Sequence, residues 1–325
     1  APEGLVATRM FTRPPTNGPE RYAALADHLA SVDVPELVDA HWLPRAIAVD
    51  GTPRPAVIMP WVAGLPLGLA VEDLLRHPDR LRRLADEWLH LIDRLRAAGI
   101  AHGDLQNGNV LVDDDLTIRL VDLDGVWLSS STLPSPAEFG HPNFQHPGRS
   151  HDDWGPDLDT FAAGVIHLSL LAIAADPDLW SFHRGENLIL DAVDFADPDR
   201  HGVWDRLEVS PDPAVRRSAA LVRQWCRAER PPAGSPRGLT EQDDAEPGID
   251  ATVMRPRPAT APAPLTVIDD SQDWWSAPAP GEDGAAAPGD AAYFDTSPRS
   301  ASHSMSGPAS PHPLSDGPAT RPGAA

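Results

Sequence analysis

Short apolar runs and one helical pattern alternate at the beginning of the chain. Residues 5–11 have the composition of a strand, and residues 20–30 repeat apolar side chains at helical spacing. Two further apolar runs, at 46–49 and 56–59, flank a turn-rich sequence at 50–53. This order predicts a strand, a helix and then an antiparallel hairpin.

A long helical pattern comes next. Residues 81–98 carry a broad apolar stripe that stops at Gly99, and glycine is common just beyond the end of a helix. Two short apolar runs follow at 110–112 and 118–121, with an aspartate-rich stretch between them. The sequence therefore predicts one helix and two short strands in this region.

The stretch 156–229 is mostly helical in pattern. Its longest apolar run, 161–175, is too short to span a bilayer comfortably and is interrupted by polar residues, so we expect a buried helix there. Taken together, the residues before 231 are expected to form a globular domain of mixed α and β structure.

The composition changes near residue 231. From there the chain is dense in Pro, Ala, Ser, Gly and Asp and has few aliphatic residues in periodic order. Such a segment buries too little apolar surface to offset its ordering entropy, so 231–325 is expected to be a disordered tail. Thr240 with Asp243, and Thr266 with Asp269, have a spacing that a phosphothreonine-reading domain would bind after phosphorylation, although such short patterns arise often by chance.

The charge excludes several classes of function. The chain has 26 basic and 48 acidic residues, a net charge of −22, which disfavours binding to nucleic acid or to an anionic membrane surface. Every basic residue is an arginine, so lysine Schiff-base chemistry and a phosphate-binding loop lysine are excluded. With one cysteine and no targeting segment, a reducing, cytoplasmic location is expected.

Three polar side chains flank the two short predicted strands. Asp104 and Asn109 precede the first strand, and Asp122 follows the second. Phosphoryl transfer needs one group to orient the attacking hydroxyl and accept its proton, and oxygen ligands to hold Mg²⁺ against the phosphates. The strands are expected to bring the three side chains together, although aspartate-rich loops between strands are often ordinary turns.

The residues around these positions resemble those of the protein-kinase superfamily. His102–Asn109 is similar to the catalytic loop H-x-D-x-x-x-x-N, and Asp122–Asp124 is similar to the metal-binding D-F-G element. Gly140–Pro147 resembles the end of an activation segment, Asp159–Gly164 the start of the central helix of the C-lobe, and Val57–Gly64 the fifth strand and hinge. The matches occur in the family's order.

The resemblance implies a fold and a domain organisation. It implies an α+β, bilobal protein-kinase-like fold with a small β-rich N-lobe and a helical C-lobe. The expected divisions are a partial N-lobe at 1–62, a C-lobe at 63–230 and the disordered tail at 231–325.

The resemblance also assigns roles to residues, with ATP and Mg²⁺ as cofactors. Asp104 would be the catalytic residue, Asn109 and Asp122 would ligate the metal, and His102 and Asp159 would support the loop. The residues expected near the nucleotide are Ala7, Arg9, Glu20, Met59, Pro60, Val62 and Gln106.

The chain departs from the family in its first strand. Kinases place a lysine there to pair with the nucleotide phosphates, and Arg9 stands at that position. Glu20 is the expected partner of Arg9 on the following helix, or else an ordinary acid at a helix N-terminus. The Gly-rich loop has no room before residue 5, and because the chain does not begin with methionine, we expect that loop to lie upstream of a fragment.

Three functions remain open. The first is an ATP- and Mg²⁺-dependent protein kinase-like phosphotransferase of the Ser/Thr type, the second a pseudokinase or scaffold, and the third a small-molecule phosphotransferase of the aminoglycoside or choline kinase type. The activation-segment pattern before Asp159 favours the first over the third. The arginine-, alanine- and proline-rich composition is typical of a bacterial genome of high GC content, and the phosphate acceptor does not follow from the pattern.

Overall fold

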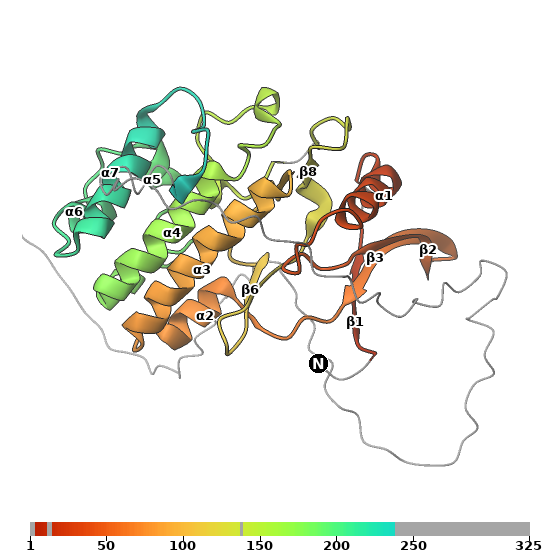
Figure 1. Ribbon diagram of the computed structural model, residues 1–325, viewed down its shortest axis with the longest axis horizontal. Coiled ribbons are helices and arrows are strands. Elements are labelled where there is room, and N and C mark those ends of the chain that lie inside the picture. Colours follow the sequence, from red (N-terminus) through yellow and green to blue (C-terminus); the bar gives the residue numbers. More distant parts are fainter. Residues whose placement is uncertain (1–3, 12–14, 137–138, 238–325) are drawn as a thin grey trace, which may run out of the picture. The chain divides into compact units, whose positions relative to one another are not determined.

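The computed structural model describes residues 4–11, 15–136 and 139–237. The first elements along the chain are a three-stranded antiparallel sheet, in the order β1-β3-β2, and one helix (Figure 1). Their bounds are β1 (Val6–Met10), α1 (Gly18–Leu29), β2 (His41–Val49) and β3 (Thr52–Pro60).

Strand β1 has one covered face and one exposed face. Val6, Thr8 and Met10 are exposed, whereas Arg9 lies opposite the fully buried Val57 of β3. Since side chains alternate between the two faces of a strand, the covered face of β1 carries Arg9 toward the interior. The predicted strand, helix and hairpin are therefore confirmed.

A second group of elements follows, with two further small antiparallel sheets, β4-β6-β7 and β5-β8. These elements are β4 (Leu65–Pro66), α2 (Leu67–Leu74), α3 (Pro78–Ala97), β5 (Ile100–Ala101), β6 (Val110–Val112), β7 (Ile118–Leu120), η1 (Leu123–Gly125) and β8 (Trp127–Leu128). The apolar stripe predicted along residues 81–98 is buried, and Trp88 donates a hydrogen bond from Nε1 to the carbonyl of Ala163 at 3.0 Å.

The remaining elements are helical. They are η2 (Pro142–Phe144), η3 (His151–Asp153), α4 (Thr160–Ala175), η4 (Pro177–Phe182), α5 (Ala192–Ala196), α6 (Val203–Glu208) and α7 (Pro213–Arg227). Helix α4 is buried from Thr160 to Ala174, and it lies between α3 and α7 (Figure 1). Gly164 lets α7 approach closely, because a side chain at this position would collide with the ring of Trp225.

The fold class is the predicted one, α+β, with small antiparallel sheets and several helices. Among the described residues no helix combines the length and the apolar character needed to cross a membrane. The interior therefore consists of helices packed around α4, with the small sheets beside them.

The first residues of the proline- and alanine-rich segment lie against the helices. Gly234 accepts a hydrogen bond from Thr160 Oγ1 and donates one to Asp157 Oδ1, both at 2.9 Å. Ser235 donates to Asp93 Oδ1 at 2.7 Å, and Arg237 forms an ion pair with the same carboxylate. The ordered part of the chain thus extends beyond the predicted boundary at residue 231, because specific polar contacts hold Gly234, Ser235 and Arg237 in place despite the composition of the segment. The two threonine-aspartate patterns lie outside the described residues.

Buried His167 makes stability depend on pH. Burial, together with the nearby Arg237, lowers the pKa of His167 to about 4, whereas the unfolded chain has an ordinary histidine. Because the folded state keeps the imidazole neutral, its contribution is fully present above pH 6.5 and is lost as the pH falls toward 4. We expect about 2 kcal/mol of unfolding free energy from this residue to be lost between pH 7.5 and pH 5.

Denaturant unfolding at several pH values measures this loss. The variant His167→Gln should show a pH dependence that is weaker by that amount. The exposed His151→Gln variant is the matched control and should behave as the wild type. Equal pH profiles for His167→Gln and the wild type would contradict the prediction.

Candidate active site

The β6–β7 hairpin brings two distant loops together. Val110 pairs with Leu120 in the hairpin, and the N–H of Val121 donates to the carbonyl of Asn109 at 3.0 Å. Asn109 therefore enters the first strand beside the point where Asp122 leaves the second. The expectation that the strands bring these two residues together agrees with this backbone pairing.

Local side-chain contacts explain why the hairpin turns where it does. The Asp113 carboxylate accepts hydrogen bonds from the N–H groups of Asp115 at 3.0 Å and Thr117 at 2.8 Å. Leu116 adopts a positive φ of 66° between them. An aspartate that binds backbone groups two and four residues later closes a turn, so part of this acidic stretch has a structural role.

Hydrogen bonds fix the Asp104 carboxylate in one orientation. Oδ2 accepts from Asn109 Nδ2 and from Gln106 Nε2, both at 3.0 Å, and Oδ1 accepts from the N–H of His141 at 2.8 Å. Asn109 Nδ2 also donates to the Asp104 carbonyl at 2.9 Å. The side chains of Asp104, Gln106 and Asn109 therefore form one connected group.

Asp159 holds the loop that carries Asp104. Its carboxylate accepts from the N–H of His102 at 2.5 Å and from the N–H of Gly103 at 2.8 Å, and the residue is only 7% exposed. Burial raises the pKa of Asp159, while His102 and the two N–H donors act in the opposite direction. The two hydrogen bonds tie the backbone of residues 102 and 103 to the Asp159 carboxylate.

His102 connects the two loops. Nε2 donates to the carbonyl of Val121 at 3.0 Å, so in the neutral ring Nδ1 is the acceptor for the N–H of Asp104 at 3.4 Å. The imidazole is fully buried. It therefore fixes the residue before Asp122 relative to Asp104.

The backbone of Asp122 is in the left-handed region, with φ 65° and ψ 71°. A residue with a Cβ adopts this conformation at a cost of about 1 kcal/mol or more, and such strain gathers at functional sites. The neighbouring Leu123 is buried in the core, and this burial helps to hold the strained residue in place.

Arg9 contacts the loop that carries Asp122 rather than the predicted helix residue. Its Nη1 pairs with Asp122 Oδ1 and lies 3.1 Å from Asp124 Oδ2. Glu20 is exposed in the first turn of α1, and no ion pair joins it to Arg9 in the described part of the chain. The expected Arg9–Glu20 partnership is therefore corrected. The residue of α1 that reaches the site is Tyr22, whose hydroxyl donates to Asp124 Oδ1.

The residues expected to meet the nucleotide base lie at the end of the first sheet. Ala7 pairs with Met59, and Val6 pairs with Pro60. Ala7, Met59 and Val62 are all half-buried, which leaves part of each accessible. The β1–β3 pairing thus places Ala7 beside Met59 and Val6 beside Pro60.

The segment after β8 packs on the loop that carries Asp104. Arg149 Nη1 donates to the carbonyl of Gly103 at 3.3 Å and also to Gln145 Oε1. Burial lowers the pKa of Arg149. A side chain at Gly140 would approach Asp104 Oδ1 to 2.7 Å, so a glycine is required where this segment crosses the loop.

The oxygen donors at this site fit Mg²⁺. The ion usually takes one or two protein ligands together with phosphates and water, and Asp122 and Asn109 offer a carboxylate and an amide oxygen. The residues that the structure describes contain no cluster of three or more His, Cys, Asp or Glu placed to hold a metal. Those residues therefore form no metal site made of protein ligands alone. The oxygen atoms of Asn109 and Asp122 suit a Mg²⁺ site that nucleotide phosphates complete.

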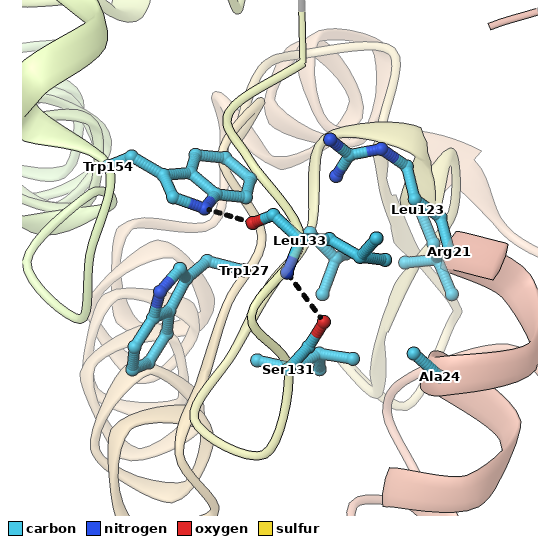
Figure 2. A pocket seen from close by; sticks show the side chains of 9 residues that line it. Arg21, Ala24, Leu123, Trp127, Ser131, Leu133 and Trp154 are labelled. Carbon is cyan, nitrogen blue, oxygen red and sulfur yellow. Dashed lines mark hydrogen bonds between the residues drawn. The ribbon is translucent and has the colours of Figure 1, made fainter. Parts of the chain in front are cut away.

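A small cavity between α1 and the segment after η1 is a poor site for a nucleotide (Figure 2). Its volume is about 10 Å³, which is room for roughly one water molecule. Figure 2 shows Trp154 and Ser131 bonded to the backbone of Leu133 beside it, and Arg21 lines the same space. The cavity belongs to the packing of α1.

The sequence did not identify Tyr22 or Asp124 as site residues. Asp124 stands where the family's D-F-G element has its glycine, and this departure was the available signal. Tyr22 gave no signal beyond an apolar position on a helix, because its partner is 102 residues away along the chain.

Comparisons with known proteins find sequence similarity to a kinase catalytic chain. The chain matches no protein-family model. It is similar to the phosphorylase b kinase gamma catalytic chain, liver/testis isoform, of Homo sapiens, with 29% identity over 187 residues that cover 49% of this chain and 43% of the human protein. The Mus musculus protein of the same name is 28% identical over 177 residues, which cover 49% of this chain and 43% of the mouse protein.

The chain spans less than half the length of these relatives. The similarity supports a protein-kinase-like phosphotransferase at the level of the superfamily.

We expect Asp159→Asn to loosen the catalytic loop locally. An amide offers one acceptor oxygen where the carboxylate offers two, so one of the two N–H groups loses its partner. Hydrogen bonds to charged groups are worth about 1.5–3 kcal/mol, which corresponds to roughly 10- to 100-fold faster amide exchange.

Native-state hydrogen exchange at His102 and Gly103 measures this effect. Asp157→Asn is the matched control, because its carboxylate binds Arg96 and Gly234 rather than the loop. Unchanged exchange at both amides in Asp159→Asn would show that the carboxylate does not hold the loop.

Proposed function

We propose that the chain is an ATP- and Mg²⁺-dependent protein kinase-like phosphotransferase that acts on serine or threonine hydroxyls. One observation carries the proposal: the Asp104 carboxylate is hydrogen-bonded to Asn109, whose backbone is in turn bonded to the residue before Asp122. A proton acceptor and two metal ligands are thereby joined in one group, which is what phosphoryl transfer requires.

Asp104 is the residue that orients the acceptor hydroxyl and takes its proton. A carboxylate has about four lone-pair positions, of which Asn109, Gln106 and the N–H of His141 occupy three. One position on Oδ1 therefore remains for the acceptor. The incoming hydroxyl would bind beside His141, so the segment that carries His141 forms one side of the acceptor site.

Asn109 and Asp122 would hold Mg²⁺ through their oxygen atoms. When bound, the ion neutralises charge that develops on the phosphates during transfer. Arg9 would bind the same phosphates, since a guanidinium can clamp phosphate oxygens bidentately. Ala7, Met59, Pro60 and Val62 would line the base.

A protein acceptor is favoured over a small molecule. The segment from Phe139 to Arg149 packs on the catalytic loop through His141 and Arg149, as a segment that receives a peptide would. The relatives are, by name, kinases of phosphorylase b, which is consistent with a protein acceptor.

A pseudokinase is the second candidate, and one observation favours it. Arg9 already pairs with both Asp122 and Asp124, so metal and phosphates must compete with these ion pairs. A site that cannot release them would bind nucleotide weakly.

Phosphate transfer from Mg-ATP, followed by intact mass and by labelling of a generic protein substrate, tests the proposal. Asp104→Asn should lower transfer by about 10²- to 10⁴-fold, the usual contribution of a general base, and should leave Mg-ATP binding in place. Asp122→Asn should weaken binding that depends on Mg²⁺. Asp115→Asn, in the exposed hairpin turn, is the matched control and should keep full transfer.

The other functions give different results. ATP consumption that depends on an added amino alcohol or aminoglycoside, without protein labelling, would indicate a small-molecule enzyme. Transfer that survives in Asp104→Asn would contradict the role of Asp104, and absence of transfer in the wild type would favour the pseudokinase.

A further inference from the structure

The Asp124 carboxylate joins Arg9 to α1. Oδ2 lies 3.1 Å from Arg9 Nη1, and Oδ1 accepts the hydroxyl hydrogen of Tyr22. Each carboxylate oxygen thus has a different partner, one from β1 and one from α1. The carboxylate thereby links β1 and α1, two consecutive elements, through a loop about a hundred residues further along the chain.

Tyr22 is a rigid partner for this carboxylate. The residue is 4% exposed, and its ring packs against Trp42 at a centroid distance of 6.0 Å. Burial and the nearby Asp124 raise the pKa of the Tyr22 phenol well above its usual range, so the hydroxyl keeps its hydrogen at neutral pH. The phenol is therefore a constant donor to Asp124.

The geometry of α1 excludes Glu20 from the same role. Successive residues of an α-helix are about 100° apart around the axis, so positions 20 and 22 are separated by about 200°. Tyr22 points into the core, and Glu20 therefore points to solvent, where the structure has it exposed.

The two carboxylates that contact Arg9 differ in the number of side chains that hold them. Asp124 is held by Tyr22 in addition to Arg9, whereas Asp122 has Arg9 as its one ion-pair or hydrogen-bond partner within the described ranges. Asp122 is thus the carboxylate that can be released to a metal. Asp124 is the one that can stay on the arginine.

We infer that Asp124 and Tyr22 are positioning residues that hold Arg9 for the nucleotide phosphates, so that α1 is coupled to the Asp122 loop by a phenol–carboxylate hydrogen bond. The inference rests on the proposed function. In this arrangement Asp124 takes the place of a helix carboxylate as the anion that orients the cation. The hydrogen bond from Tyr22 fixes the position of Asp124 relative to α1.

Nucleotide binding and transfer, measured side by side on the full chain, test the inference. The variants are Tyr22→Phe, which removes only the hydroxyl, and Asp124→Asn, which removes only the charge. Each should raise the Kd and the KM for Mg-ATP about 5- to 20-fold with a smaller change in kcat, because Arg9 loses its orientation while Asp104 is untouched. Asp27→Asn, on the exposed side of α1, is the matched control, and Glu20→Gln tests the rival helix residue.

A double variant separates positioning from general support of the fold. In the background Arg9→Ala, Tyr22→Phe should cause no further loss of Mg-ATP affinity, since its effect passes through the guanidinium. Thermal unfolding of each variant verifies that it is folded. Three results would overturn the inference. The first is a full additional loss of Mg-ATP affinity when Tyr22→Phe is added to Arg9→Ala, and the second is wild-type affinity in Tyr22→Phe and Asp124→Asn. The third is a loss in Glu20→Gln equal to the loss in those two variants.

The same measurements distinguish this inference from the proposed function. Weakened Mg-ATP binding in Tyr22→Phe and Asp124→Asn, with no transfer by any variant, would support the positioning role and refute the phosphotransferase. Transfer that depends on Asp104 but is indifferent to Tyr22 and Asp124 would refute the positioning role alone. No binding of Mg-ATP by the wild type would overturn both.

Discussion

The hydrogen bonds from the backbone of His102 and Gly103 to the buried Asp159 carboxylate are the constraint on which the site depends. Asp159 immediately precedes α4, which is buried from Thr160 to Ala174. A loop tied to this helix is tied to a buried element, and buried, densely packed elements open less readily than exposed ones. Asp159 therefore anchors the start of the loop to the core, and contacts within the loop from Gln106 and Asn109 orient the Asp104 carboxylate.

The other half of the site depends on a very small piece of sheet. β6 and β7 are three residues each, and such a hairpin has little stability alone. Buried Val110 and Leu120 anchor it, and His102 joins Val121, just after the end of β7, to the loop that carries Asp104 by a hydrogen bond. The two loops are thus held together by packing beneath them and by one imidazole between them.

Sequence patterns predicted several of the elements and the order of the site residues, because both are local properties. They did not predict α2 or the two-residue strands β4, β5 and β8. The alternation of strand residues, the stripe from Leu81 to Leu95 and the spacing of the loop residues can all be read along the chain. The contacts of Arg9 could not be predicted, since they are made with a loop more than a hundred residues further along the chain. The same limit applies at Gly234 and Ser235, where hydrogen bonds to Asp157 and Asp93 fix a segment of disorder-prone composition.

The left-handed backbone of Asp122 restricts how this site can change during evolution. The position needs a residue that tolerates positive φ, and among residues with side chains Asn and Asp tolerate it best. The one mild replacement, asparagine, exchanges a single oxygen for nitrogen and removes the charge that draws a cation. Under the proposed function, this single substitution would remove a metal ligand's charge and leave the fold intact, so inactive proteins with the same architecture are one substitution away.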